Sequence, residues 1–344
     1  MRTKLLIIFS LLVAVIAKAD VEINETNFPD EKFRAYLLNQ NFGSDGVITG
    51  EEISKIVYIN VTDLGISDLS GIQIFTELHT LECDNNKLTT INLSNNPALM
   101  TIYCNNNLLT SVDVTKNPVL NTIACHTNQI TSLDVTHNPV LEYLVCYNNL
   151  LTSLDVSQNS RLKMLWCGNN NIGTIDLSNN TALTSIDFTN CMLKSLDISK
   201  NALLNQLGCA GNQLTSLNVS NNKALTYISC YDNQIKDAKM DELVNSMSVI
   251  EKGRFFVILE PTLTDGNVCT TSQVEIAQSK GWTVYDSRMN EYRGSDSASK
   301  IATIETNTQP AAVYDLNGRK SGKVSKTKGV FLVNGRKVMM INTK

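Results

Sequence analysis

Apolar and polar positions repeat along this chain with a period of 21 residues. The period is marked by cysteines at 83, 104, 125, 146, 167, 209 and 230, with Phe188 in the one remaining slot. Aligned on this step, each unit reads L-x-x-L-x-C-x-x-N-x-L-x-x-L-x-V-S-x-N. The L-x-C segment alternates inward-facing and outward-facing positions, as a β-strand does. We therefore predict one short strand per unit.

This unit resembles the leucine-rich repeat, with cysteine in place of the third leucine. Around Trp166 the matching positions are Leu162, Leu165, Cys167, Asn170, Ile172, Ile175, Leu177 and Asn180. The resemblance covers residues 56–237 and recurs about nine times. It implies a solenoid whose concave face is a parallel β-sheet and whose convex face is irregular or built from short strands. Strands stacked about 4.8 Å apart would complete an apolar core that no single unit can form.

Asparagine and cysteine rows accompany the leucines. One asparagine row occupies positions 86, 107, 128, 149, 170, 212 and 233, with Cys191 substituting once; the other occupies 96, 117, 138, 159, 180, 201 and 222. Because a buried amide can pair with turning backbone, we interpret both rows as structural. We expect the inward cysteines to be reduced packing residues, since their rotamers do not suit disulfide geometry. Cys269, in a loop near the C-terminal end, is the strongest candidate for a reactive thiol.

Different sequences cap the two ends of the array, as stacked repeats require. Residues 20–55 predict a helical N-terminal cap, with an apolar stripe at Phe33, Tyr36 and Leu37 and a second short helix after Thr49. Residues 238–286 predict helix–strand units. Their signals are the stripe Met240, Leu243, Val244 and Met247, the strand-like FFVIL, the helical TSQVEIAQSK, Gly281 as a stop, and WTVYD.

The loop of residues 41–52 in the N-terminal cap resembles a degenerate EF-hand when it is aligned on Gly46. Ligands for calcium would then come from Asn41, Asp45, Val47, Thr49 and Glu52. Gly43 lacks a side chain and Asn41 lacks a charge, so we expect weak calcium affinity and no other cofactor. Thr49 and Glu52 also fit a helix capping box, which accounts for Glu52 without a metal.

Both termini have the sequence features of export signals. Residues 1–19 combine Arg2 and Lys4, an apolar run and Ala17-Lys18-Ala19, which is typical of a secretory signal peptide; a membrane anchor is the alternative. Residues 287–310 have the composition of a linker. Residues 311–344, with turns at Asn317-Gly318 and Asn334-Gly335, resemble the C-terminal sorting segments of Bacteroidetes proteins exported by type IX secretion. A plain β-hairpin tail is the alternative there. The combination implies an exported bacterial protein, extracellular or on the outer cell surface.

Composition and motifs argue against catalysis. The net charge of −4 gives no basic field for nucleic acid or anionic membrane. Three histidines all fall within repeats, and no nucleophile, zinc or phosphate-loop motif occurs. An acidic row on the convex face comprises Asp113, Asp134, Asp155, Asp176 and Asp197. We expect these carboxylates to bond neighbouring Ser and Thr residues, although a cation-binding row is the alternative. We therefore predict no enzymatic activity.

Outward strand positions gather aromatic side chains at the middle of the array. These are the candidate ligand-binding residues Tyr103, His126, Tyr143, Val145, Tyr147, Met164 and Trp166. Tyr, Trp and Met are enriched in interface cores, and a contiguous exposed patch of this kind marks a binding site. Scattered surface aromatics, or a patch covered by a loop, are the alternatives. We predict a secreted or surface binding protein that recognises an extracellular protein or peptide, including a host protein, through Trp166. A self-associating surface-layer component and a glycan-binding module remain alternatives.

Overall fold

The computed structural model describes residues 19–259 and 265–295, and the backbone of four short strands between residues 313 and 340. The chain divides into two units, residues 1–295 and 296–344. The predicted signal peptide lies outside the described residues apart from Ala19, as does the predicted linker from residue 296 onward.

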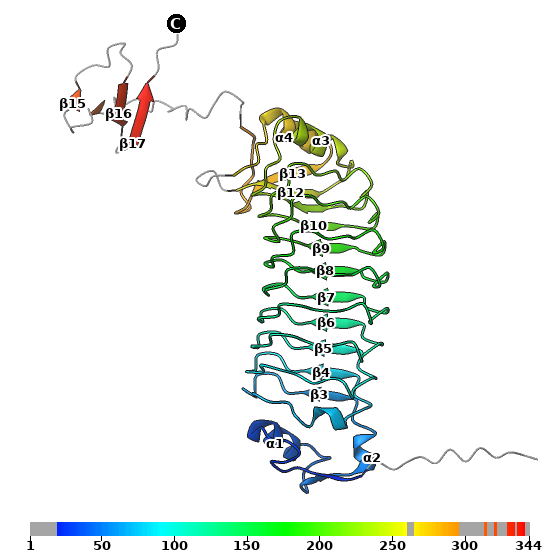
Figure 1. The fold of residues 1–344 in the computed structure, drawn as a ribbon. Coiled ribbons are helices and arrows are strands. Elements are labelled where there is room, and N and C mark those ends of the chain that lie inside the picture. Colours follow the sequence, from blue (N-terminus) through cyan, green and yellow to red (C-terminus); the bar gives the residue numbers. More distant parts are fainter. Residues whose placement is uncertain are drawn as a thin grey trace, which may run out of the picture. The chain divides into compact units, whose positions relative to one another are not determined.

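A parallel sheet of eleven strands runs the length of the first unit, in the order β13-β12-β11-β10-β9-β8-β7-β6-β5-β4-β3 (Figure 1). The repeats supply β3 (Tyr58–Asn60), β4 (Thr80–Glu82), β5 (Thr101–Tyr103), β6 (Thr122–Ala124), β7 (Tyr143–Val145), β8 (Met164–Trp166), β9 (Ser185–Asp187), β10 (Gln206–Gly208) and β11 (Tyr227–Ser229). Equivalent residues pair from strand to strand, so that Leu144 lies beside Leu165 and Leu165 beside Ile186. The predicted leucine-rich-repeat solenoid of 21-residue units is confirmed.

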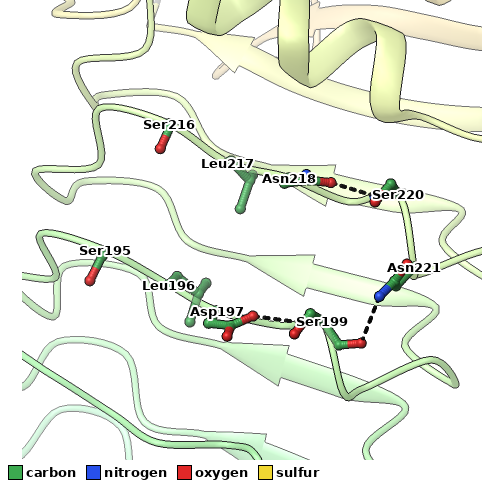
Figure 2. Close-up of a pocket in the computed structure, with 9 residues that line it drawn as sticks. All are labelled: Ser195, Leu196, Asp197, Ser199, Ser216, Leu217, Asn218, Ser220 and Asn221. Carbon is green, nitrogen blue, oxygen red and sulfur yellow. Dashed lines mark hydrogen bonds between the residues drawn. The ribbon is translucent and has the colours of Figure 1, made fainter.

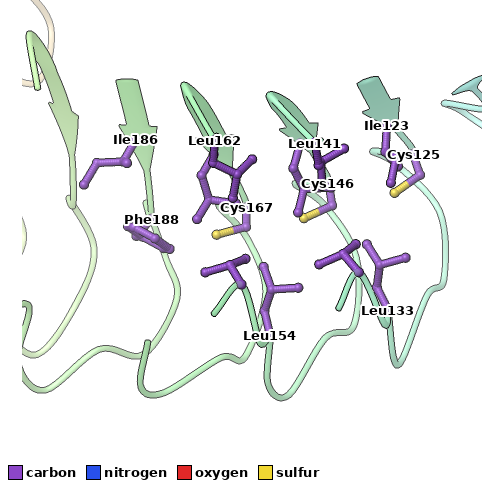
Figure 3. Packing of buried hydrophobic residues seen from close by; sticks show 14 of the residues in the cluster. Ile123, Cys125, Leu133, Leu141, Cys146, Leu154, Leu162, Cys167, Ile186 and Phe188 are labelled. Atoms are coloured by element: carbon purple, nitrogen blue, oxygen red, sulfur yellow. The ribbon is translucent and has the colours of Figure 1, made fainter. Parts of the chain in front are cut away.

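The inward positions of successive turns stack into one continuous core (Figure 3). Leu165 and Cys167 have no exposed surface, and the same holds for Phe188 in the slot that lacks a cysteine. Each turn buries its apolar side chains against the turns before and after it, so the core exists only through stacking.

All nine cysteines are free and buried, which confirms the expectation of reduced packing residues. Burial raises the pKa of the Cys125 and Cys209 thiols to about 12, because a thiolate would be desolvated there. Cys269, the strongest candidate for a reactive thiol in the sequence, does not fit that role. It has no exposed surface, and burial raises the pKa of its thiol to about 12.

The first asparagine row bonds the backbone at the end of each strand. Asn170 represents it: Nδ2 donates to the carbonyl oxygens of Cys146 (3.1 Å) and Cys167 (2.8 Å), and Oδ1 accepts from the Leu151 N–H (2.9 Å). In the exceptional turn, the Cys191 thiol donates to the Cys167 carbonyl at 3.2 Å and replaces one of these bonds. The row therefore joins each turn to its predecessor.

The second asparagine row is also buried and also joins adjacent turns. Asn159 Nδ2 donates to the carbonyl oxygens of Val135 and Asn138, both at 2.9 Å. The Oδ1 atom of every asparagine in this row has no hydrogen-bond partner among the described residues. The structural interpretation of both rows is confirmed.

The N-terminal cap contains two helices and a small antiparallel pair. Helix α1 spans Glu31–Leu38 and buries Phe33 and Leu37, and α2 spans Gly50–Ile53. Strands β1 (Val21–Glu22) and β2 (Val47–Ile48) pair with each other. A 3₁₀ turn, Ile72–Ile74, precedes β4.

The N-cap residue of α1 also joins the cap to the first repeat. Asp30 Oδ1 accepts from the backbone of Lys32 and Phe33, whereas Oδ2 accepts from the N–H (2.8 Å) and hydroxyl (2.9 Å) of Ser67. One carboxylate thus begins the helix and holds it against the solenoid.

The C-terminal cap has the predicted helix–strand order. Helix α3 (Ala238–Ser246) precedes β12 (Gly253–Ile258), and α4 (Thr271–Ser279) precedes β13 (Trp282–Asp286). The predicted helix stripe is buried, and Gly281, which follows the C-cap residue Lys280 of α4, has φ +86°. Residues 287–295, which their composition assigns to a linker, are hydrogen-bonded to this cap: the Tyr292 N–H donates to Val284 O and the Ser295 N–H to Cys269 O.

The second unit contains a four-stranded antiparallel sheet in the order β15-β14-β16-β17. Its strands are β14 (Val313–Tyr314), β15 (Lys320–Ser321), β16 (Gly329–Val333) and β17 (Arg336–Met340). Val333 pairs with Arg336, so residues 334–335 connect two antiparallel strands, as the Asn-Gly pattern predicts. The turn residues themselves lie outside the described residues.

Candidate binding surface

The sheet presents three rows of outward side chains on the concave face. In each turn these are the first and third strand residues and the residue that follows the inward cysteine. Strand pairing aligns them, so that Tyr143 lies beside Met164 and Val145 beside Trp166. Residues that the sequence places in one outward row therefore lie side by side on neighbouring strands.

The structure brings the predicted residues together over four strands, β5 to β8. We call this set the concave patch: Tyr103, His126, Tyr143, Val145, Tyr147, Met164 and Trp166. Every member retains solvent-exposed surface, and Tyr143 is the most open at 36%. The rings of His126 and Tyr147 stack with centroids 4.2 Å apart and an interplanar angle of 8°. Partial burial lowers the pKa of His126, so the ring is neutral at physiological pH and suits this stacking.

Trp166 is held in place by a hydrogen bond to the next strand. Its Nε1–H donates to the Ser185 hydroxyl at 2.9 Å, and that hydroxyl lies 3.4 Å from Gln206 Oε1. A fixed aromatic ring loses little conformational entropy when a partner binds, which favours an anchor role. Position in the array alone could not reveal this bond, because it joins side chains on different strands.

A hollow of about 360 Å³ lies next to Trp166, on the side away from the concave patch. Its lining comes from strands β8 to β11 and the residues after them, namely Trp166, Ser185, Ile186, Asp187, Thr189, Gln206, Gly208, Tyr227, Ser229 and Tyr231. Sequence reasoning missed this hollow. The available signal was Gly208, which removes a side chain from the middle row just where the carboxylate of Asp187 stands beside it.

The convex face carries the acidic row. Each carboxylate accepts a hydrogen bond from the backbone two residues later, as Asp197 does from Ser199 at 2.9 Å (Figure 2). Hydrogen bonds from the Ser199 backbone and hydroxyl lower the pKa of Asp197. A groove of about 330 Å³ between two turns has Asp197 and Asn218 in equivalent places, each bonded within its own turn. The expectation of local Ser and Thr bonding is confirmed.

The loop predicted to bind calcium has one feature of an EF-hand and lacks another. Gly46 adopts φ +88° at the turn, but a Cβ on Gly43 would clash with the Leu37 carbonyl, so this backbone has no room for a ligand there. Glu52 Oε2 accepts from the Thr49 N–H (2.9 Å) and hydroxyl (2.7 Å), which confirms the capping box. Over the part of the chain that the structure describes, no cluster of three or more His, Cys, Asp or Glu could hold a metal. Calcium binding stays a prediction.

The fold defines the class of this protein as a leucine-rich-repeat solenoid. It is similar to the functional domain of InlJ from Listeria monocytogenes, which includes a cysteine ladder, with 30% identity and a TM-score of 0.66. That match covers 78% of this chain and 58% of the InlJ chain, so this chain spans little more than half of its relative. No family model and no curated protein matches.

Two internalins from Listeria monocytogenes show the same fold. Internalin InlF has 19% identity over 78% of this chain and 92% of its own, with a TM-score of 0.55. Internalin C2 has 21% identity over 62% of this chain and 97% of its own, with a TM-score of 0.54. None of the helices in the described residues is long and apolar enough to cross a membrane.

Proposed function

We propose that this protein is a secreted or surface binding protein whose concave face recognises an extracellular protein partner. The observation that carries the proposal is the concave patch itself, where seven aromatic or apolar-rich side chains of adjacent turns are partly exposed together. Similarity to internalins supports a protein-binding module rather than a catalyst. A host protein is one candidate partner, and a glycan or a second copy of the chain are the competing ones.

Trp166 is the anchor in this proposal. It has the largest side chain in the concave patch, it is fixed by its bond to Ser185, and Tyr143 and Tyr147 lie on the preceding turn. Binding energy in interfaces concentrates in such aromatic residues near the centre of a patch. Export belongs to the same proposal, since an extracellular partner requires it, and a sorting role of the C-terminal tail is one route to export.

The test begins with an identified partner and compares dissociation constants for the wild-type protein and Trp166→Ala. An anchor contributes about 2 kcal/mol or more, so the dissociation constant should rise about thirtyfold. Lys200→Ala, an exposed residue outside the sheet, serves as the matched control and should bind as wild type does. Full affinity in Trp166→Ala would remove the anchor role. Concentration-dependent mass in light scattering, without any partner, would favour self-association instead.

A further inference from the structure

Asp187 contributes an uncompensated carboxylate to the hollow beside Trp166. Its Oδ1 accepts from the Thr189 N–H at 2.8 Å. Within the described residues, Oδ2 accepts no hydrogen bond and no cationic side chain lies within ion-pair distance of this carboxylate. Oδ2 of Asp187 can therefore pair with a group from a bound molecule.

Two glycines leave the surroundings of this carboxylate open. A Cβ on Gly208, in the next strand, would lie 2.9 Å from Asp187 Oδ1, and a Cβ on Gly168, in the preceding turn, would lie 3.5 Å from it. Neither glycine has φ in the left-handed region, so backbone conformation does not demand them. Their effect is to keep side chains away from Asp187.

Aromatic rings lie on both sides of the carboxylate along the sheet. Trp166 comes from the strand before Asp187, and Tyr227 and Tyr231 come from the turn two strands later. Burial raises the pKa of Tyr231, with Tyr227 and Asp187 adding to the effect, so this phenol stays neutral. Faces of Trp and Tyr attract cations, and a carboxylate between them adds direct charge pairing.

The distribution of charged residues over the concave face also favours a cationic ligand. In the three outward rows of β4 to β11 the acidic residues are Glu82, Asp84 and Asp187, and none is Lys or Arg. Arg254 follows on β12, three strands from β9, and is in register with Ser185 rather than with Asp187. Its guanidinium lies over the rings of Tyr227 (5.9 Å) and Phe256 (5.6 Å), so it is already engaged.

We propose that this hollow receives a basic side chain, Lys or Arg, from the protein partner, with Asp187 as its counter-ion and the rings of Trp166 and Tyr231 as its aromatic walls. The inference rests on the proposed function of the concave face and extends it from an apolar anchor to a specific charged contact. A volume of about 360 Å³ falls within the range of about 300–1,000 Å³ that is usual for small-ligand sites.

The test uses small probes on the full chain, so it does not depend on a known partner. Of the two tryptophans, Trp282 is buried and bonded to Ser248 O, so a change in fluorescence on titration reports on Trp166. The probes are N-acetyl-arginine amide and N-acetyl-citrulline amide, which has a similar shape and no charge. The arginine probe should bind at least tenfold more tightly, and added salt should weaken it.

Variants separate charge from shape. Asp187→Asn should lose at least tenfold in affinity for the arginine probe, and Gly208→Ala should lose affinity without a change of charge. Asp197→Asn on the convex face should behave as wild type does. Equal binding of the two probes, no binding of either, or binding of a hexose such as N-acetylglucosamine in their place would overturn the inference.

An identified partner distinguishes this inference from the proposed function. Loss of partner affinity in both Trp166→Ala and Asp187→Asn supports both. If Trp166→Ala weakens binding and Asp187→Asn does not, the basic side chain is excluded and the binding face stands. If neither variant weakens binding, the proposed function fails, whatever the arginine probe does.

Discussion

Adjacent residues of each strand face opposite sides of the sheet, so one packs in the core and the next is exposed on the concave face. Cys167 points into the core and has no exposed surface, whereas Trp166 faces outward and bonds Ser185. The sequence could assign both directions because strand side chains alternate strictly. Cys269 lies in a loop without such a period. It is covered by residues distant in sequence, since Tyr292 Oη donates to its carbonyl at 2.9 Å, and local pattern could not reveal that cover.

At the residue scale, we predict that Asp30→Ala lowers the free energy of unfolding by about 1–2 kcal/mol, because it removes the N-cap of α1 and the bonds to Ser67. Burial raises the pKa of Asp30, but hydrogen bonds from Ser67, Phe33 and Lys32 outweigh it and lower the pKa below 3.8. A carboxylate whose pKa is lower in the folded state than in the unfolded state stabilises the fold at pH values above the unfolded-state pKa. That contribution to stability is lost as the pH falls through the folded-state pKa. The difference from wild type should therefore be full at neutral pH and shrink below about pH 4.

Denaturant unfolding of both proteins between pH 7 and pH 3 measures this difference. Glu275→Ala, an exposed residue of α4, is the control and should show little change at any pH. A difference that stays constant down to pH 3 would mean that the carboxylate charge of Asp30 is not involved.

At the scale of the element, each turn is stabilised by an asparagine side chain whose amide forms hydrogen bonds with main-chain groups. Backbone hydrogen bonds between turns continue past the cysteine as far as Asn169, whose N–H donates to Thr189 O at 2.7 Å. At the next residue, the amide of Asn170 bonds two carbonyl oxygens and one backbone N–H. Recurrence of asparagine at a fixed place predicted this role. The recurrence of one residue type could not predict the hollow at Asp187. The hollow forms because Gly208 has no side chain, and its lining comes from four different strands.

We predict that Asn170→Ala lowers the free energy of unfolding by about 3 kcal/mol, since it leaves the buried Cys146 carbonyl and the Leu151 N–H without partners. Ser153→Ala, an exposed position of the preceding turn, should change it by less than about 0.5 kcal/mol. Urea unfolding followed by circular dichroism measures both. Equal stability of the two variants would show that water replaces the amide at no cost.

At the scale of the molecule, the first unit is a stack in which each turn contacts only its neighbours and two caps close the ends. The sequence predicted the strand count within the repeats, the order of the caps and the direction of the sheet. These predictions were possible because the same pattern recurs in about nine units, so single exceptions such as Phe188 and Cys191 do not obscure it.

We predict that deletion of a whole unit, residues 84–104, is tolerated better than deletion of half a unit, residues 84–93. The larger deletion joins two equivalent positions and keeps leucine, cysteine and asparagine rows continuous, whereas the smaller one breaks all three. Thermal unfolding should give one cooperative transition for the larger deletion, at a higher temperature than for the smaller. The reverse order of stability would contradict a stack with interchangeable turns.

Because β3 to β11 pair in register, equivalent positions on the concave face are evenly spaced from one turn to the next. Neighbouring turns are about 4.8 Å apart, so Trp166 and Asp187 are one step apart and Tyr103 is three steps from Trp166. A partner that touches several turns must carry its own contacts at multiples of this step. The proposed binding surface would therefore select partners whose contacts repeat at this spacing, and duplication of one turn would lengthen the surface without changing the spacing.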